Sequence, residues 1–554
     1  MKIALGQMRV LPGQPERNFE QMKRRIDEAR LAGCSIIAFP EMCVGGYLLG
    51  DRWTESCWCD YLCSFNEKIC ELSNDIVIIY GNLFVDKRKK NKDGRSRKFN
   101  AGFAYYNQKP VPRNGDLPEG VAFKSLLPNY RIFDDERYFF SLQELAEDMC
   151  IPIEKLLQPF TATIDNTPFR FGVEICEDLW FNDYRYQGKP LNISSFLIEN
   201  GAECIFNLSS SPWTYGKDRA RNNRIQDSYK DCSHFVPFYY VNCVGVQNNG
   251  KNIVVFDGDS TIYNRNAEVV LKSGKPFTDE LIIFDTESSC KPILKKSPSI
   301  IESKFNAVIE GIRGMDELVG NNTFPYIVGI SGGIDSALSA CLLSEAIGSH
   351  RVIGVNLPTR YNSEKTKTIA KNLSEKLGIK FFTIPIEDMV TINTTLLSQF
   401  NPTEFNLENI QAKIRGTSIL SNIAGILKGL MTCNGNKIEI ALGYATLYGD
   451  VNGAIAPLGD LLKTEVFEMA RYLNESIFND EVIPSMLLPD ENFEFAMPPS
   501  AELKANQIDP MKWGYHDALI QKFTDYQKTG AEEILQWYLD DTLCEKLGLS
   551  TNLF

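Results

Sequence analysis

The sequence predicts an α/β fold in two parts, a sandwich in the first half and a doubly wound parallel sheet in the second. Three observations support this prediction. Short β-prone runs alternate with helical patterns up to the run LIIFD at residues 281–285, a stretch of linker composition follows, and strand–helix alternation then begins again. A chain of 554 residues is long enough for two or more domains.

The first half is predicted to form a sandwich because its β-prone runs are separated by turns and helical segments. Residues 18–32 have the charged, amphipathic pattern of a surface helix. The β-prone runs are rich in Val, Ile, Phe and Tyr and lie at residues 2–10, 34–42, 75–85, 169–176, 202–209 and 238–247. In such folds the loops at strand ends are available for chemistry.

A change in composition separates the two halves. Residues 288–298, SSCKPILKKSP, carry two prolines among lysines and serines, which is typical of a linker. Predicted strands then alternate with predicted helices, the strands at 325–330, 351–358 and 380–386 and the helices at 337–346 and 363–377. We therefore predict one domain at 1–287, a linker at 288–300 and a second domain at 301–554.

Composition narrows the class of protein. An apolar content of 44% and a charged content of 23% are ordinary for a globular protein. A net charge of −13 argues against broad binding to nucleic acids or anionic membranes. Fifteen cysteines without the apolar stretch of a signal peptide indicate a cytoplasmic location in which they stay thiols. No uninterrupted apolar run reaches the ~18 residues that a membrane span needs.

Two patterns have plainer explanations than a binding site. Residues 86–98 hold eight Lys or Arg between two strand-like segments, which favours a solvated hairpin tip, with nucleic-acid contact as the alternative. Cys59, Cys63 and Cys70 share one helical stripe without a nearby histidine, so packing thiols are favoured over zinc ligands.

The run FRFGVEICEDLW ends an apolar strand at Cys176. A cysteine is most often a small core side chain, but at the carboxyl end of a strand it is also placed to act as a nucleophile. Glu41 follows another strand behind a proline, where a capping role is the alternative. Lys124 precedes a loop rich in aromatic and acidic residues, and an exposed, solubilising lysine is the alternative there.

Together these three side chains suit the hydrolysis of an amide through a thioester. We expect each of them at a strand or loop end of one α/β layer. The Cys176 thiolate would attack, after activation by a base or a cation. Glu41 would take the proton and return it to the leaving ammonia. Lys124 and the backbone N–H after the cysteine would hold the oxyanion.

The motifs FPEM, KSLLPNYRIFDDERYF and GVEICEDLW resemble, in this order, the Glu–Lys–Cys motifs of the nitrilase (carbon–nitrogen hydrolase) superfamily. The resemblance implies an αββα sandwich over the first half. It also implies the roles of base for Glu41, oxyanion stabiliser for Lys124 and nucleophile for Cys176. Glu136 is similar to a second glutamate of the family, which positions the lysine.

A further segment points to the substrate of this half. NLSSSPWTYGKDRAR is similar to the substrate side of the glutaminase branch of the superfamily. The resemblance implies that Tyr130, Ser211 and Lys217 hold the α-amino and α-carboxylate groups of glutamine. A simple turn at Ser211 is the alternative.

The run YIVGISGGIDSALSACLL has the order strand, glycine-rich loop, helix. Gly332 and Gly333 let backbone N–H groups approach an anion at a helix N-terminus, and Asp335 and Ser336 add a metal ligand and a phosphate donor. The Gly-Lys-Ser/Thr ending of a Walker A loop is missing, and a tight turn is the alternative. SGGIDSA resembles the signature of the N-type ATP pyrophosphatases, which implies an adenine nucleotide α-hydrolase-like sheet and ATP as a substrate.

Later segments narrow the family. NLPTRYNSEKTKTIAKNLSEKLGI, ENIQAKIRGTSIL and PPSAELKANQ resemble NAD synthetases, and the nitrilase-like first half is similar to the glutamine-dependent branch of that family. The resemblance implies that ATP adenylates the nicotinate carboxylate of deamido-NAD⁺ and that ammonia from L-glutamine displaces AMP. Mg²⁺ would offset charge on the departing pyrophosphate. Relatives of this kind form homo-oligomers.

The same resemblance assigns residues to ligands. ATP would be contacted by Gly329, Ile330, Ser331, Gly332, Gly333, Ile334, Asp335, Ser336, Asn434, Lys463 and Ser500. Asn409 and Glu439 would contact deamido-NAD⁺, and Asp335 and Glu439 would bind the metal. For Lys463 and Asn409 a surface role is the alternative.

The chain departs from the family pattern in two places. Asn434 and Ile438 stand where the family has threonine and serine, so we expect an adenosine site that is tuned rather than lost. Many members continue into a Lys-Arg-rich segment that reaches the dinucleotide, whereas this sequence ends CEKLGLSTNLF. Another residue would then serve, or the sequence is shortened.

Two other functions are considered. One is an adenylating amidotransferase with a different acceptor, similar to GMP synthetase or to a tRNA-modifying enzyme, although the anionic chain disfavours tRNA. The other is a non-catalytic scaffold that binds nucleotide, which the intact Glu41, Lys124 and Cys176 disfavour.

Overall fold

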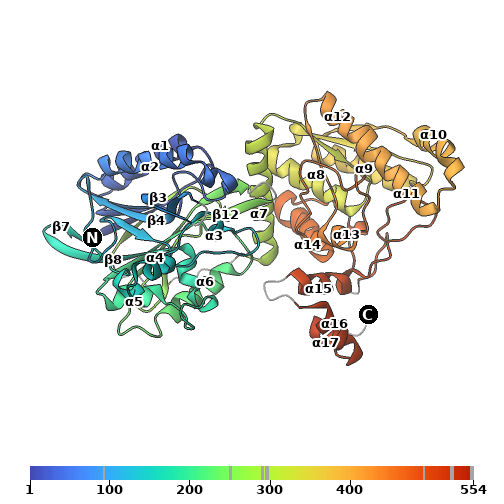
Figure 1. The fold of residues 1–554 in the computed structure, drawn as a ribbon. Coiled ribbons are helices and arrows are strands. Elements are labelled where there is room, and N and C mark those ends of the chain that lie inside the picture. The colour runs from blue at the N-terminus through green and yellow to red at the C-terminus, as the bar shows by residue number, and fades with distance from the viewer. Residues whose placement is uncertain are drawn as a thin grey trace. The chain divides into compact units, whose positions relative to one another are not determined.

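The computed structural model describes residues 1–91, 94–248, 252–288, 292, 298–490, 493–524 and 529–549. The chain divides into two compact units, Met1–Pro298 and Ser299–Phe554, and each is described here by itself (Figure 1). Most of the expected linker at 288–300 lies outside the described residues, so the limits of the linker stay a prediction.

The first unit contains two sheets packed face to face. One has the strand order β15-β1-β2-β3-β4-β5, with β6 paired to β4, and the other has the order β14-β13-β10-β9-β8-β7. The bounds are β1 Lys2–Gln7, β2 Ile36–Ala38, β3 Val77–Lys90, β4 Ser96–Tyr106, β5 Lys109–Pro110, β6 Val121–Phe123, β7 Phe160–Ile164, β8 Thr167–Ile175, β9 Cys204–Ser209, β10 Phe238–Asn242, β13 Thr261–Tyr263, β14 Val269–Lys272 and β15 Glu280–Asp285. A separate antiparallel pair is formed by β11 (Val244–Asn248) and β12 (Ile253–Asp257).

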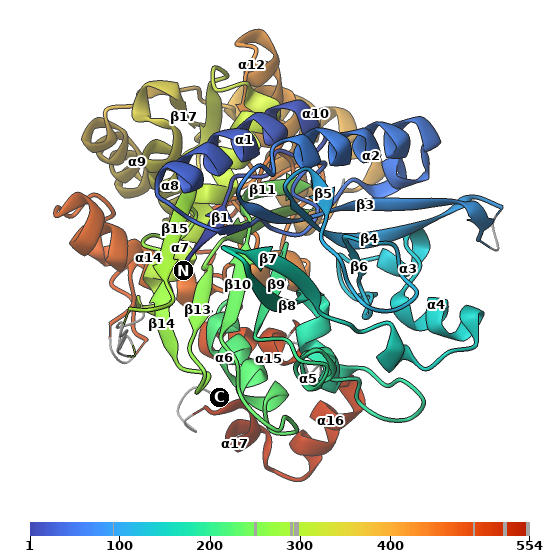
Figure 2. The same ribbon diagram turned by 90° about the vertical axis from the view of Figure 1, so that its left-hand side faces the viewer.

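Helices cover the outer face of each sheet, which gives the expected αββα order (Figures 1 and 2). The helices α1 (Pro15–Leu31) and α2 (Ser56–Glu71) lie on one side, and α5 (Ile193–Glu199) and α6 (Lys217–Ser228) lie on the other. Two short helices, α3 (Asp135–Tyr138) and α4 (Leu142–Met149), follow β6. The layer between the sheets is filled by inward side chains of both, among them Ile79, Phe171 and Phe206.

The parallel strands in the centre of each sheet position the chemistry. In one sheet β1, β2 and β3 run parallel, and in the other β8, β9 and β10 do. Because parallel neighbours end at the same edge, the residues that follow β2, β8 and β9 come together at one end of the sandwich.

The basic run at 86–98 is partly regular structure rather than a hairpin tip alone. Residues 86–90 continue β3 and residues 96–98 belong to β4, while Lys92 and Asp93 lie outside the described residues. Two of its cations pair with acids, since Lys87 Nζ lies 2.7 Å from Asp60 and Arg97 Nη1 lies 2.8 Å from Asp148.

The cysteine stripe belongs to α2. The thiols of Cys59 and Cys63 lie 3.4 and 3.5 Å from the carbonyl oxygens of Trp53 and Leu83. In the described part of the chain, no three His, Cys, Asp or Glu side chains are grouped so that they could hold a metal. The contacts of Cys59 and Cys63 agree with packing thiols, and the expectation that the stripe binds no zinc stays a prediction.

The second unit is built on a parallel sheet of strand order β18-β17-β16-β19. The bounds are β16 Tyr326–Gly329, β17 Val352–Asn356, β18 Lys380–Thr383 and β19 Leu430–Met431. The chain order reverses between β16 and β19, so the glycine-rich loop after β16 lies at the switch point where such sheets bind ligands. The doubly wound class is confirmed, although the two-residue β19 was not predicted.

Helices pack around this sheet, whereas the C-terminal helices α15 (Trp513–Thr524), α16 (Ala531–Leu539) and α17 (Leu543–Leu547) lie apart from it (Figure 1). The other helices are α7 Ile300–Met315, α8 Ile334–Ile347, α9 Glu364–Leu377, α10 Glu387–Leu397, α11 Glu404–Lys413, α12 Ser421–Ile426, α13 Lys437–Leu442 and α14 Lys463–Tyr472. The helix predicted at 363–377 has Ser363 as its N-cap, with the Ser363 hydroxyl accepting from the Thr366 N–H at 3.2 Å. None of the helices within the described ranges has the length and apolar character needed to cross a bilayer.

Candidate active sites

Glu41, Lys124 and Cys176 lie together at one end of the first unit. Glu41 follows β2 and Lys124 follows β6 in one sheet, whereas Cys176 follows β8 in the other. The Lys124 ammonium lies 2.7 Å from Glu41 Oε1, and the charges of both side chains act on the Cys176 thiol. The expectation of a single layer is therefore corrected. A sandwich places the strand ends of both its sheets at the same end, so the site draws on both.

The Glu41 carboxylate is fully buried and held on both oxygens. Oε1 accepts from Lys124 Nζ and from Asn100 Nδ2, both at 2.7 Å, and Oε2 accepts from the backbone N–H of Ser210 at 2.9 Å. A Cβ at Gly81 would lie 2.4 Å from the Glu41 Cα, so the glycine allows the close approach of these two chain segments. These contacts hold the carboxylate in one position.

The second acid beside Lys124 is Asp135, and the assignment of Glu136 to this position was wrong. Lys124 Nζ lies 3.2 Å from Asp135 Oδ2, and the Tyr47 hydroxyl donates to Asp135 Oδ1 at 2.7 Å. Glu136 is exposed and accepts a hydrogen bond from Asn129 Nδ2 at 3.0 Å. Neighbouring helix residues point about 100° apart, so only one of two adjacent acids on α3 can face the lysine.

Burial and charge oppose each other in this cluster. Burial works against the charge of Lys124, but the carboxylates of Glu41 and Asp135 raise its pKa well above the usual range. Burial, together with the charge of Glu41, raises the pKa of the Cys176 thiol well above its usual value, while Lys124 acts in the opposite direction. The resting thiol therefore keeps its proton, and activation requires transfer to a base that is already in place.

The Cys176 backbone is strained. Its φ of 44° lies in the left-handed region, which residues other than glycine rarely adopt. The residue is the first of η3 (Cys176–Asp183), directly after β8. A strained turn at a strand end directs the thiol out of the sheet, which is typical of nucleophiles.

Of the residues predicted to bind glutamine, Lys217 acts on the Cys176 thiol and Tyr130 contacts the neighbouring Glu177. The Tyr130 hydroxyl lies 3.3 Å from the Glu177 carboxylate, and Lys217 lies at the start of α6, where the charges of Cys176 and Glu177 act on it. Burial lowers the pKa of Lys217. The Ser211 N–H donates to the Asn242 side chain at 2.8 Å, which fixes the turn.

Glu177 was not predicted. Its carboxylate is buried, accepts from the Tyr184 hydroxyl at 2.7 Å and from Tyr130, and has a pKa raised by burial. The available signal was an acid directly after the candidate nucleophile in the run CEDLW.

The second unit contains a pocket of about 860 Å³ at the glycine-rich loop. Of the ligand residues predicted for this half, all but Gly332 line it: Gly329, Ile330, Ser331, Gly333, Ile334, Asp335, Ser336, Asn409, Asn434, Glu439, Lys463 and Ser500. Gly332 has a φ of +93°, and a Cβ there would lie 2.2 Å from the Thr366 carbonyl oxygen. Only glycine fits this position of the loop.

Lys463 lies between the two predicted metal ligands. Its ammonium is buried, 2.5 Å from Asp335 Oδ2 and 3.4 Å from Glu439 Oε1. Burial opposes the charge, but the two carboxylates raise the pKa of Lys463 above its usual value. Burial also raises the pKa of Glu439 to about 7. A surface role for Lys463 is excluded.

Asn436 was not predicted, although it contacts both acids. Its Nδ2 donates to Asp335 Oδ1 at 3.0 Å, and its backbone N–H donates to Glu439 Oε2 at 3.3 Å. Asn436 is also the N-cap of α13, where its Oδ1 accepts from the Glu439 N–H at 3.1 Å.

The remaining predicted ligands have defined partners. Asn434 Nδ2 donates to the Gly329 carbonyl oxygen at 2.9 Å, next to the glycine-rich loop. Asn409 Oδ1 accepts from the Thr446 hydroxyl at 2.7 Å. Ser500 Oγ accepts from a backbone N–H two residues later. These contacts hold the three polar side chains at the pocket wall.

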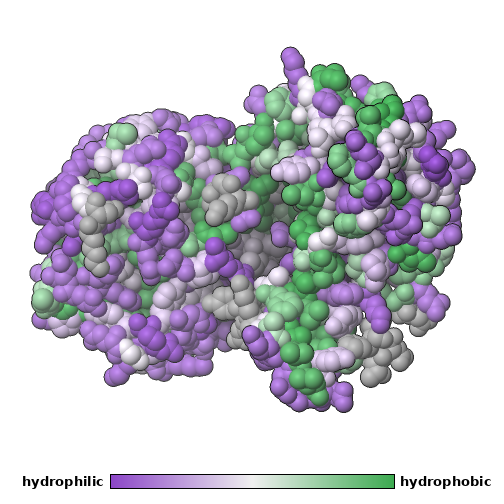
Figure 3. All heavy atoms as spheres, turned by 45° about the vertical axis from the view of Figure 1, so that its right-hand side comes forward, coloured by the Kyte–Doolittle hydropathy of each residue, from purple (hydrophilic) through white to green (hydrophobic). Residues whose placement is uncertain are grey.

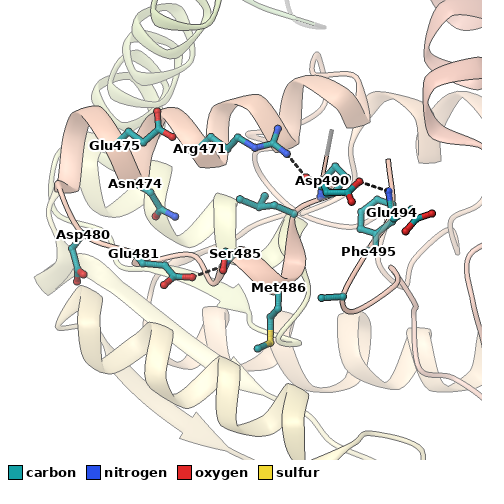
Figure 4. A pocket seen from close by; sticks show the side chains of 13 residues that line it. Arg471, Asn474, Glu475, Asp480, Glu481, Ser485, Met486, Asp490, Glu494 and Phe495 are labelled. Atoms are coloured by element: carbon teal, nitrogen blue, oxygen red, sulfur yellow. Dashed lines mark hydrogen bonds between the residues drawn. The ribbon is translucent and has the colours of Figure 1, made fainter. Parts of the chain in front are cut away.

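A second pocket of about 870 Å³ lies elsewhere in the same unit (Figure 4). Five of its thirteen lining residues are acids, and two of these accept hydrogen bonds from the backbone of the pocket wall. Glu481 Oε1 accepts from the Ser485 N–H at 2.6 Å, and Asp490 Oδ1 accepts from the Glu494 N–H at 2.9 Å. It contains none of the predicted ligand residues and no glycine-rich loop. Volume alone thus does not distinguish a nucleotide site, whereas the loop at a switch point does.

Comparisons with known families and proteins agree with this division. The carbon-nitrogen hydrolase family model matches residues 2–292, and the NAD synthase family model matches residues 308–547. The glutamine-dependent NAD(+) synthetase of Synechocystis sp. is 31% identical, covering 93% of this chain and 87% of its own. That of Thermotoga maritima is 30% identical, covering 98% and 89%.

Solved structures are similar over nearly the full length. The glutamine-dependent NAD⁺ synthetase from Acinetobacter baumannii, solved in complex with adenosine diphosphate, has a TM-score of 0.72 and 26% identity and covers 99% of this chain and 92% of its own. The enzyme of the same name from Cytophaga hutchinsonii has a TM-score of 0.67 and 18% identity, covering 88% and 84%, and supports the fold.

Proposed function

The chain belongs to the family of glutamine-dependent NAD(+) synthetases, and from this premise we propose which of its residues carry out each half of the reaction. The enzyme is a ligase that uses glutamine as its nitrogen donor and ATP to convert deamido-NAD⁺ to NAD⁺. The alternatives of a different acceptor or a non-catalytic scaffold have no support in the comparisons.

In the first unit, Cys176 attacks the side-chain amide carbon of glutamine. Glu41 accepts the thiol proton and returns it to the leaving ammonia, and Lys124 stabilises the oxyanion together with the N–H of Glu177. Water then releases glutamate from the thioester. The observation that carries this proposal is the buried Lys124 ammonium, 2.7 Å from Glu41 and acting on the Cys176 thiol.

Glutamine itself is a zwitterion, and the wall beside Cys176 offers both signs of charge. We assign the α-carboxylate of glutamine to Lys217 and its α-amino group to Glu177, with Tyr130 and Ser211 as hydrogen-bonding partners. Glu177 and Lys217 act electrostatically on each other as well as on the thiol, so they lie within one small site.

In the second unit, the N–H groups of the 329–336 loop and the N-terminus of α8 bind the ATP phosphates. Lys463 stabilises negative charge on the pyrophosphate as it departs. Asn434 and Ser500 contact the adenosine side, and Asn409 contacts deamido-NAD⁺; Glu439 is placed either for the metal or for the dinucleotide.

Asp335 and Glu439 fit a Mg²⁺ ion. Both aim a carboxylate oxygen at one cation, the Lys463 ammonium, and carboxylate oxygens are the ligands that Mg²⁺ prefers. The described residues contain no group of three acidic, His or Cys ligands, so phosphate oxygens and water would complete the shell. When bound, Mg²⁺ offsets charge on the leaving pyrophosphate.

We also propose that the protein forms homo-oligomers in the cytoplasm. Large apolar side chains are exposed on the second unit at Leu396, Phe400 and Ile426, and apolar surface is visible on this unit in Figure 3. Such a surface favours association. The cysteines of the described residues are free thiols, as a reducing location requires.

The test is a coupled assay of NAD⁺ formation from deamido-NAD⁺ and ATP, run in parallel with glutamine and with ammonium. Cys176→Ala should lower the glutamine-driven rate by ~10⁴-fold or more, since it removes the nucleophile. The ammonium-driven rate should stay within about twofold, because the second unit is unchanged. Equal loss with both nitrogen donors contradicts the division of labour.

A further inference from the structure

Asp178 lies two residues after Cys176 and has no part in the chemistry described so far. It is 2% exposed, and the hydrogen bonds that its carboxylate accepts from the described residues come from backbone N–H groups. Oδ1 accepts from Ser125 and Leu126, both at 2.9 Å, and Oδ2 accepts from Ile175 at 3.0 Å. Charge-assisted bonds of this kind are stronger than neutral ones and are directional.

The three donors belong to the two halves of the glutaminase site. Ile175 is the last residue of β8, directly before the nucleophile, whereas Ser125 and Leu126 directly follow Lys124. The strands that lead to the two segments lie in different sheets. The Asp178 carboxylate therefore joins the backbone beside Cys176 to the backbone beside Lys124, across the sandwich.

The strained backbone of Cys176 explains why the hydrogen bonds of Asp178 matter. Cys176 has a φ of 44°, and a conformation of this kind persists only where its surroundings enforce it. Asp178 accepts from the residue before Cys176 while lying two residues after it, so its carboxylate closes the turn around the cysteine. The same carboxylate fixes where the Lys124 segment lies relative to that turn.

We propose that Asp178 is the positioning residue of the glutaminase site, which sets the Cys176 thiol and the Lys124 ammonium at catalytic separation across the two sheets. The proposal rests on the roles of Cys176 and Lys124 given above. Asp178 touches neither glutamine nor the reacting atoms. It acts through the two backbone segments that it holds.

Glu174 provides a matched control. It lies on the same strand, two residues before Cys176, and is 1% exposed. Its carboxylate accepts from Ser194 Oγ at 2.6 Å and Asn207 Nδ2 at 2.8 Å, which are side chains. Burial raises the pKa of both Glu174 and Asp178 to about 7, and the charge of Glu174 adds to the rise at Asp178.

Removing the charge has different consequences at the two positions. In Glu174→Gln the new amide can still accept from Asn207, and it can donate to the Ser194 hydroxyl, which is free to turn. In Asp178→Asn the new NH₂ group must face at least one backbone N–H, which cannot turn. The bridge to either β8 or the Lys124 segment is then broken.

The experiment compares Asp178→Asn with Glu174→Gln in the full chain, measuring NAD⁺ formation with glutamine and with ammonium. We expect Asp178→Asn to lower kcat with glutamine by ~100-fold, as for loss of oxyanion stabilisation. KM for glutamine should change by less than about threefold, because Tyr130, Ser211 and Lys217 still bind it. Glu174→Gln should stay within about threefold in both constants.

Asp178→Glu keeps the charge but moves the oxygens by one methylene, and it decides the question if the asparagine variant does not fold. A loss in kcat of ~10-fold with unchanged ammonium-driven synthesis supports positioning. Values of kcat equal to those of Glu174→Gln, or parallel losses in KM and in ammonium-driven synthesis, overturn it. Should Cys176→Ala keep glutamine-driven synthesis, the proposed function fails instead.

Discussion

Each unit holds a buried lysine between two carboxylates, and the two clusters differ in what surrounds them. Lys124 lies between Glu41 and Asp135, whose side chains are 0% and 6% exposed. Lys463 is equally buried, but its partners are 20% and 18% exposed and line the pocket of about 860 Å³. The first cluster is closed and the second is open on its acidic side.

The difference follows from what each site has to do. The proposed thioester mechanism needs one proton acceptor and one fixed cation beside the reacting carbonyl group, and a closed, rigid cluster holds both in place. Adenylation needs room for two nucleotides and a metal ion, so the acids of the second cluster must remain accessible. In the proposed roles, a lysine between two acids takes part in catalysis in the first unit and binds nucleotide and metal ion in the second.

Lys124→Met should produce the largest effect, because it removes the cation that pairs with two buried carboxylates. We expect glutamine-driven synthesis to fall by ~10³-fold through loss of the oxyanion donor. The unpaired acids should also destabilise the first unit by about 3–5 kcal/mol. Ammonium-driven synthesis, measured in the same preparation, should stay within about twofold.

A loss that is equal with both nitrogen donors would mean that damage to the first cluster spreads to the second unit. The conclusion that the closed and open clusters act independently of each other would then be wrong. Urea unfolding followed by tryptophan fluorescence checks the stability part of this prediction.

Lys463→Met should separate the open cluster from the closed one. We expect synthesis to fall by ~100-fold with either nitrogen donor, since the variant loses a cation that stabilises the departing pyrophosphate. Glutamate release from glutamine, which needs only the first unit, should stay within about threefold. In addition, Mn²⁺ added without nucleotide should bind about tenfold more tightly, because Asp335 and Glu439 are no longer neutralised.

Mn²⁺ affinity that is unchanged or weaker in this variant would argue that the two acids do not form a cation site. The control is Lys504→Met, since Lys504 is half exposed, lines the same pocket and pairs with Glu408 at 2.9 Å instead. Lys504→Met tests whether the loss of another lysine from the pocket raises Mn²⁺ affinity in the same way.

The sequence revealed the parts of both clusters that depend on local pattern. Glu41, Lys124 and Cys176 follow strands in recognisable motifs, and the glycine-rich loop is identified by its residue types and their spacing. Asp135, Asn436 and Asp178 were not predicted, because their roles depend on which distant backbone or carboxylate group each one meets. Two adjacent acids at 135 and 136 look alike in a sequence, and only the helix geometry of α3 selects between them.

That selection is itself testable with a pair of neighbouring variants. Asp135→Asn should lower glutamine-driven kcat by ~10-fold, because Lys124 loses the partner that orients its ammonium at 3.2 Å. Glu136→Gln should change it by less than about twofold, since this side chain is exposed and accepts its hydrogen bond from Asn129 rather than from Lys124. Larger effects at residue 136 than at residue 135 would restore the assignment made from the sequence.

The smallest effect should come from Asn434→Thr, which returns the family residue to the open cluster's pocket. Asn434 donates to the Gly329 carbonyl oxygen at 2.9 Å and accepts from the Thr432 hydroxyl at 3.0 Å, and a threonine hydroxyl can take over one of these bonds. One neutral hydrogen bond is worth about 1 kcal/mol, so KM for ATP should change by less than about fivefold at unchanged kcat. Initial rates at varied ATP with ammonium as donor measure this without involving the closed cluster. A change in kcat beyond tenfold would mean that Asn434 orders the glycine-rich loop for catalysis. Activity would then depend on exact side-chain geometry in the open pocket as strongly as in the closed cluster.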